Sequence, residues 1–345
     1  MMKTNKYWQR RFEALERMEH RSASRLFREL QREFDKAERD VIKLIEEWYD
    51  RLAENNEDIT AADGRKFISD AQLEEFKWEV EDYIAIGKRN KGNEQWMKQL
   101  ENASARVHIN QLDLAKMQIA NRLEVLYQNY NVKLANFAEK AITDTYYHSM
   151  FEVQRGFNVG WKIQAFDERR LQKIMQFPWS ADNKTFSDNI WDNKTKLINN
   201  LHTELTQMTL RGGNPEQAID NMSRLMKSSK SNARRVVMTE SSYFYSASQE
   251  EVYKDLDVEQ FQIVATLDNK TSRICRDLDL KVYDMKDYEV GVTAPPFHPY
   301  CRTVTVPYFD DELTIGSRAA RGQDGKTYYV PGNMKYEDWY KEYAA

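Results

Sequence analysis

The chain has 345 residues, of which 31% are charged and 41% are hydrophobic, and its mean hydropathy is -0.81. These values indicate a folded, charged, helix-rich protein of two or three domains rather than a disordered chain. No apolar run approaches the roughly 20 residues that span a membrane, and the net charge of -4 argues against indiscriminate coating of nucleic acid. The charged N-terminal segment and the presence of only two cysteines, Cys275 and Cys301, predict a cytoplasmic origin without a disulfide.

The first half of the sequence predicts long amphipathic helices. Between Tyr7 and Asn55 there is no Gly or Pro, and apolar residues recur at steps of three and four. This pattern predicts one long helix, which either packs on later helices of the same chain or presents part of its surface to another subunit. Further helical patterns cover 70–87, 94–140 and 141–176.

The second half changes in character after a boundary loop at 177–191, which contains the first proline of the chain. Helices are expected at 188–210, 215–228 and 231–256, the second with Pro215 in its first turn. After these helices, β-branched and aromatic runs bounded by turn residues predict strands at 261–267, 281–284 and 302–308.

The expected fold is therefore mainly α with a small C-terminal α+β module, long amphipathic N-terminal helices and few short strands. We expect an elongated helical region at 1–180 and a module of helices followed by small β elements at 181–312. An extended tail with a short helix is expected at 313–345.

Two cysteines and a histidine form the most distinctive chemical group. Cys301 follows Cys275 by 26 residues, and His298 stands three residues before Cys301 on a proline-rich turn. Such a turn can aim an imidazole and a thiolate at one point, and Zn²⁺ accepts both ligand types. The alternative is that the cysteines are buried as small apolar residues and the histidine hydrogen-bonds the backbone. A fourth metal ligand could come from Asp268, Asp277 or Asp279.

A nucleophilic pair of Cys275 and His298 is the other chemical hypothesis. The surrounding sequence, ICRDLD, has no known nucleophile signature, and its carboxylates are expected to raise the pKa of the Cys275 thiol. The chain also lacks an HExxH motif, a Walker-type loop, a nucleophile elbow and a paired-carboxylate motif. We therefore predict that the chain is not an enzyme, with a cysteine- or zinc-dependent enzyme as a remote alternative.

The C-terminal segment carries an ordered motif that runs from DNKT through ICRD and KVYD to PPFHPYCR. In this order the motif resembles that of the phage Mu F-like minor head proteins, also called phage head morphogenesis proteins. The preceding helix, ARRVVMTES, is similar to a family segment that ends in Thr-Glu, here Thr239 and Glu240. The resemblance covers about residues 190–345. The residues that carry the motif are Asp268, Thr271, Cys275, Pro296, His298, Pro299, Cys301 and Arg302.

The chain departs from the resemblance at three positions. Members with four cysteines place two of them where this chain has Ser272 and Thr303, so the four-thiolate metal site of such members is lost here. Leu280 stands where the family tends to have Gly, so that turn must avoid positive φ or tolerate strain. We therefore expect no cofactor and a fold held by its turns and by hydrogen bonds from His298, with zinc as the second hypothesis.

The resemblance implies a minor capsid protein of a tailed bacteriophage, acting in head morphogenesis and in DNA packaging or ejection. Its expected partners are the portal protein and a scaffold or major capsid protein, with no membrane. The expected location is inside the capsid at the portal vertex, after assembly in the cytoplasm of the host bacterium. We expect the helical half to bind the portal and the terminal module to act as a rigid cap.

The most basic segment, SRLMKSSKSNARR, supports an alternative function as a DNA-binding internal protein that is ejected with the genome. It contains no acidic residue, and several of its cations fall on one helical face. Such a patch can neutralise the phosphates of double-stranded DNA without reading bases, or it can be an ordinary solvated helix surface. The residues of this basic segment are Arg224, Lys227, Lys230, Arg234 and Arg235.

Overall fold

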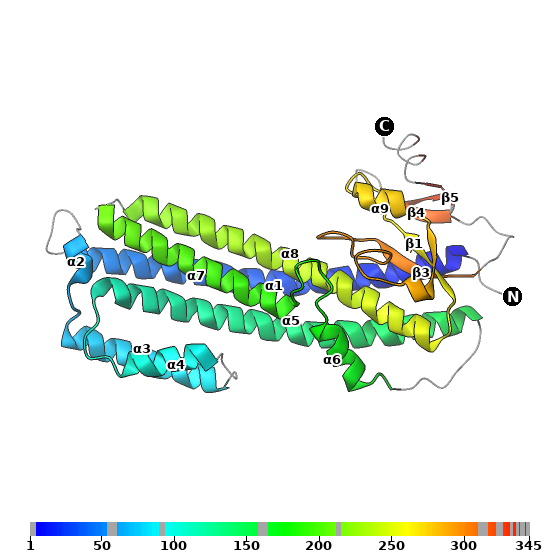
Figure 1. Ribbon diagram of the computed structural model, residues 1–345. Helices are drawn as coiled ribbons and strands as arrows, with labels where there is room; N and C mark the ends of the chain where they lie inside the picture. Colours follow the sequence, from blue (N-terminus) through cyan, green and yellow to red (C-terminus); the bar gives the residue numbers. More distant parts are fainter. Residues whose placement is uncertain are drawn as a thin grey trace. The chain divides into compact units, whose positions relative to one another are not determined.

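The computed structural model describes residues 5–53, 61–89, 94–157, 165–211, 215–309, 317–321 and 327–331, with Met334, Lys335, Asp338 and Glu342. Long helices dominate it, and a three-stranded antiparallel sheet lies near the C-terminus, which confirms the predicted fold class (Figure 1). None of the described helices is long and apolar enough to cross a membrane. The helices are α1 (Asn5–Ala53), α2 (Ala61–Arg65), α3 (Asp70–Arg89), α4 (Glu94–Ser104), α5 (Gln111–Phe157), α6 (Glu168–Gln176), α7 (Phe186–Arg211), α8 (Pro215–Asp255) and α9 (Arg273–Leu278).

The predicted break between two helices at residue 140 is wrong, because α5 runs without interruption through that position. The interruption lies instead before Asn110, which caps α5. Its Oδ1 accepts a hydrogen bond of 2.8 Å from the Asp113 backbone N–H, and its Nδ2 donates to the Asp113 carboxylate. An Asn that caps the third following residue is a helix-start signal, so the sequence contained the evidence for this boundary.

The two helices predicted at 215–228 and 231–256 form the single helix α8. The polar stretch between them contains neither Gly nor Pro, and buried Met226, Ser229 and Ala233 continue the inward-facing stripe across it. Helical periodicity therefore outweighs local polarity at this point.

The chain forms two compact units, each assembled from separated segments. The first unit comprises Met1–Leu26, Leu134–Phe186 and Arg235–Ala345, and the second comprises Phe27–Lys133 and Ser187–Arg234. Both units take residues from either side of position 180. The expected boundary at that position therefore does not coincide with the units that the contacts define.

The second unit is helical, and its core is rich in aromatic residues. Phe34 packs edge-on against Tyr127, and buried Trp96 donates a hydrogen bond of 3.0 Å from Nε1 to Oδ1 of Asn121. Lys194 and Glu124 form a buried ion pair in the same unit. The unit thus combines an apolar core with polar contacts that fix the helix register.

The first unit contains the sheet, with strand order β2-β1-β3. The strands are β1 (Gln260–Val264), β2 (Val282–Asp284) and β3 (Val304–Tyr308), which confirms the positions of the three predicted strands within a few residues. Phe261 of β1 pairs with Tyr283 on one side and with Pro307 on the other. Phe261 shares its core with Trp8 of α1 and Tyr253 of α8, so the sheet is anchored on helices.

The tail contains a two-stranded antiparallel hairpin of β4 (Ser317–Arg321) and β5 (Thr327–Pro331), where the sequence predicted only an extended segment. The TYYVP sequence of β5 is a typical strand sequence, whereas SRAAR of β4 has no β-branched or aromatic residue. The short helix predicted near the C-terminus lies largely outside the described residues.

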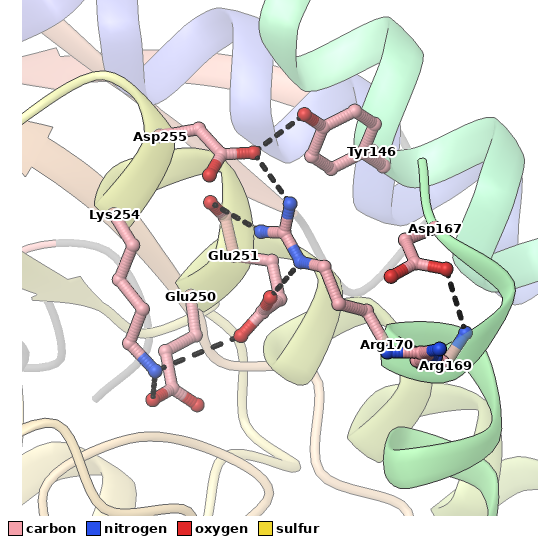
Figure 2. Close-up of polar contacts among 8 residues, drawn as sticks. All are labelled: Tyr146, Asp167, Arg169, Arg170, Glu250, Glu251, Lys254 and Asp255. Atoms are coloured by element: carbon pink, nitrogen blue, oxygen red, sulfur yellow. Dashed lines mark hydrogen bonds and ion pairs between the residues drawn. The ribbon is translucent and has the colours of Figure 1, made fainter. Parts of the chain in front are cut away.

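A charged cluster fastens α6 to the C-terminal end of α8 in the first unit (Figure 2). The guanidinium of Arg170 pairs with Glu251 and, at 2.9 Å, with Asp255. Asp255 also accepts a hydrogen bond of 2.6 Å from the Tyr146 hydroxyl, and Asp167 caps α6. One arginine thus connects three helices, α5, α6 and α8.

Candidate functional site

The two cysteines and the histidine come together in the first unit. Cys275 lies in the first turn of α9, where its backbone N–H donates a hydrogen bond of 3.3 Å to the N-cap residue Ser272. His298 and Cys301 lie on the turn that leads to β3, and the Cys301 N–H closes this turn with a bond of 3.2 Å to the His298 carbonyl. Tyr300 in the turn has a positive φ of 61°.

The three side chains converge within a few ångströms. The Cys275 Sγ lies 3.2 Å from the His298 Nε2 and 3.7 Å from the Cys301 Sγ, and both thiols are free and buried. The His298 Nδ1 lies 2.7 Å from the Pro299 carbonyl oxygen, so Nδ1 carries the proton and donates it. In this tautomer of the neutral ring, Nε2 is the acceptor and faces the sulfur of Cys275.

A hydrogen bond between the thiols makes them unequal. It lowers the pKa of Cys301 to about 7 and, together with burial, raises the pKa of Cys275. The sequence predicted the raised pKa of Cys275 but attributed it to nearby carboxylates. The predicted direction of the pKa shift is confirmed, but its predicted cause is wrong. Asp277 is exposed beside Arg273, and the largest contribution to the raised pKa of Cys275 comes from Cys301.

The aspartates considered as a fourth metal ligand serve other roles. Asp268 pairs with Arg302, and Asp279 accepts a hydrogen bond of 2.9 Å from the Ala265 N–H. Among the described residues, the group that could hold a metal ion contains Cys275, His298 and Cys301 and no carboxylate.

Ser272 and Thr303, which stand where the resemblance predicts two further cysteines, both lie beside the cluster. Ser272 and Thr303, together with Cys275 and His298, line a cavity of about 20 Å³. The side chains of Ser272 and Thr303 also hydrogen-bond to the Cys275 thiol. Two hydroxyls therefore stand beside the cysteines and the imidazole, in a space of the size of a water molecule.

Residues 199–306 match the family model of the phage Mu protein F like proteins. The chain carries a phage Mu F-like domain. This family is that of the phage head morphogenesis or minor head proteins, which are structural proteins of the phage head. Neither the curated proteins nor the solved structures gave a significant match.

The remaining motif residues of the Mu F-like domain form a second polar cluster. Asp268 accepts two hydrogen bonds from Arg302, at 2.6 and 2.8 Å, and one of 2.9 Å from the Lys270 N–H. Thr271 Oγ1 lies 3.1 Å from Asp268 Oδ1. These bonds outweigh burial and lower the pKa of Asp268. The cluster joins the loop before α9 to the start of β3.

Helix α8 hydrogen-bonds to the turn of residues 298–301 in the domain. Thr239 Oγ1 accepts a hydrogen bond of 3.3 Å from the Tyr300 N–H, and the Ser242 hydroxyl donates one of 2.8 Å to the Cys301 carbonyl. Buried Glu240 accepts a bond of 3.0 Å from the Trp179 indole, and burial raises its pKa to about 7. The sequence singled out Thr239 and Glu240 by resemblance alone, and it gave no sign of these contacts.

Backbone geometry explains three further positions of the Mu F-like domain. Leu280 adopts a positive φ of 63°, so its turn tolerates the strain that the absence of glycine predicted. Pro296 is buried and follows a cis peptide bond, whereas Pro299 is exposed. Pro296 thus restricts the backbone on the buried side of the turn, and Pro299 restricts it on the exposed side.

The basic segment of α8 is partly committed to contacts within the second unit. Lys230 pairs with Asp35 of α1 at 2.5 Å, and the Arg234 guanidinium lies 5.7 Å from the centre of the Phe27 ring. Ser223 donates to Glu38 in the same region. Although the segment has no acid of its own, the fold places acidic groups of α1 beside it. The exposed basic residues of the segment are Arg224, Lys227, Arg234 and Arg235.

Proposed function

We propose that the chain is a minor capsid protein of a tailed bacteriophage, located inside the capsid at the portal vertex, where it acts in head morphogenesis and in DNA packaging or ejection. The match to the Mu F-like family over residues 199–306 carries this proposal. Its partners would be the portal protein and a scaffold or major capsid protein.

The internal construction of the site supports a structural role over catalysis. The motif residues are engaged with one another and with α8, and the cavity beside Cys275 and His298 is about 20 Å³. Pockets that hold organic substrates are usually about 300–1,000 Å³. A hydrogen-bonded cysteine and histidine without room for a substrate make the cysteine-dependent enzyme the weakest alternative.

The helical part offers exposed apolar side chains suited to a protein partner. Trp78 on α3 is 73% exposed, and Phe67 and Val107 are 68% and 66% exposed. Aromatic residues of this kind frequently anchor protein interfaces. They support the assignment of portal binding to the helical half of the chain.

Portal binding is tested by co-purification of the full-length chain with portal rings. Full-length protein is required because both compact units contain segments from either side of position 180. Trp78→Glu should lower the recovery of the portal, whereas Ile274→Glu, on an exposed position of α9, should leave it unchanged. A loss only with Ile274→Glu would transfer the binding surface to the Mu F-like domain, and no recovery of the portal by the unmodified chain would refute portal binding.

DNA binding is the second candidate function, favoured by the exposure of Arg224, Lys227 and Arg235. Phosphate contacts release counterions, so the affinity for duplex DNA should fall steeply and linearly on logarithmic axes as salt rises. Replacement of the three residues by Gln should flatten this slope. Absence of duplex binding even at low salt would eliminate the role for the purified protein.

A further inference from the structure

The ligand atoms of Cys275, His298 and Cys301 lie within 4.8 Å of one another, which brings the cluster close to the geometry of a metal site. In a tetrahedral zinc site with Zn–S distances of about 2.3 Å, two thiolates lie about 3.8 Å apart. The Sγ atoms of Cys275 and Cys301 are 3.7 Å apart. The His298 Nε2, at 3.2 Å from the Cys275 Sγ, needs to move by only about 0.4 Å to reach the corresponding tetrahedral sulfur–nitrogen separation.

The surroundings of the cluster orient its ligand atoms. Metal-binding histidines commonly donate their other ring N–H to a carbonyl, as the His298 Nδ1 does to Pro299. The Cys301 sulfur accepts hydrogen bonds from the backbone of Phe297 and Thr303, which orient it. These contacts hold the donor atoms toward a common centre.

The fourth side of the cluster is formed by hydroxyl groups. Structural zinc sites usually have four protein ligands, whereas sites with three protein ligands keep a water molecule in the fourth position. Here the fourth side holds Ser272, Thr303 and the cavity of about 20 Å³. A single water needs roughly 10–15 Å³ and two to four polar partners, and this cavity meets both requirements.

We propose that Cys275, His298 and Cys301 bind one zinc ion, and that a water molecule held by Ser272 and Thr303 completes its coordination. The site is therefore an open one, whose fourth ligand exchanges with small molecules and whose metal leaves more readily than from a four-cysteine site. This inference does not depend on the function in the phage head.

Occupancy is tested on the full-length chain purified from zinc-supplemented medium. Elemental analysis should find about one zinc per chain, lost in Cys301→Ser and retained in Asp277→Asn, a matched control whose carboxylate is exposed beside Arg273. A folded, reduced wild-type chain without zinc would overturn the proposal. This result depends only on the wild-type protein, so a Cys301→Ser variant that fails to fold does not affect it.

The open position is tested by replacing zinc with Co²⁺ and recording the visible spectrum. Added azide, a small linear anion that can take the place of one water molecule, should change the spectrum of the wild type and of Thr303→Val, which removes the hydroxyl but supplies no ligand. Thr303→Cys should supply a fourth ligand, abolish the response and slow the transfer of zinc to a chelator by about tenfold or more. A wild-type spectrum that does not respond to azide would overturn the open position even if one zinc were bound.

Discussion

Replacement of Asp268 by Asn should destabilise the Mu F-like domain, because Asp268 is the charge partner of a largely buried arginine. The Asp268 and Arg302 side chains are 8% and 22% exposed, and two hydrogen bonds of 2.6 and 2.8 Å connect them. Removal of one member of a buried pair costs about 3–5 kcal/mol. Since water reaches part of Arg302, we expect a loss of about 2–3 kcal/mol.

Hydrogen exchange measures this loss locally, which matters because a chain with two compact units need not unfold in one step. Peptides covering the sheet and α9 should exchange faster in Asp268→Asn. Asp277→Asn is the matched control: its ion pair with Arg273 is exposed and should contribute less than about 1 kcal/mol.

The effect should also depend on pH in a defined direction. The pKa of Asp268 is lowered in the folded state, so its stabilisation is complete above the unfolded pKa of about 3.9 and disappears as the pH falls through the folded pKa. The difference between the wild type and Asp268→Asn should therefore shrink below about pH 4. Equal exchange in Asp268→Asn and Asp277→Asn at neutral pH would refute the reasoning.

Three further predictions concern other parts of the first unit. Leu280→Gly should raise the thermal midpoint slightly, because relief of about 1–2 kcal/mol of left-handed strain exceeds the entropic cost of glycine; a lower midpoint would contradict this. Arg170→Met should cost about 1–3 kcal/mol and speed hydrogen exchange in α6, whereas exposed Arg169→Met should do neither. Burial raises the pKa of Glu240 to about 7, so the free energy of unfolding should fall as the pH rises from the unfolded pKa of about 4.3 to about 7. Glu240→Gln should remove this part of the pH dependence, as measured by urea titrations at several pH values.

The sequence predicted the long first helix and the three strands because their signals are local. An apolar stripe at steps of three and four, in a segment without Gly or Pro, is typical of one long helix, and β-branched runs between turn residues are typical of strands. The N-cap residue Asn110 marks the start of α5, but the helical periodicity continues across it, so the sequence predicted the helix boundary at residue 140 instead. The hairpin of β4 and β5 was missed because β4 has no β-propensity of its own and depends on its partner.

The sequence identified the residues of the candidate site, but it did not predict most of the contacts among them. The spacing of Cys275, His298 and Cys301 suggested convergence, which the structure shows at 3.2 and 3.7 Å. The role of the aspartates was not predictable, because pairing of Asp268 with Arg302 depends on a contact between residues 34 positions apart. The contacts of α8 with the turn, through Thr239 and Ser242, are likewise long-range and have no local signal.

We propose that this chain is built into the phage head, and the protein content of the particles is the direct test of that proposal. Quantitative mass spectrometry of purified, DNA-filled particles from a host that produces the phage tests it most directly, with the major capsid protein as the internal reference. We expect the chain in every preparation at a small fraction of the amount of the major capsid protein. Particles that are infectious and contain none of the chain, although the lysate contains it, would contradict the account.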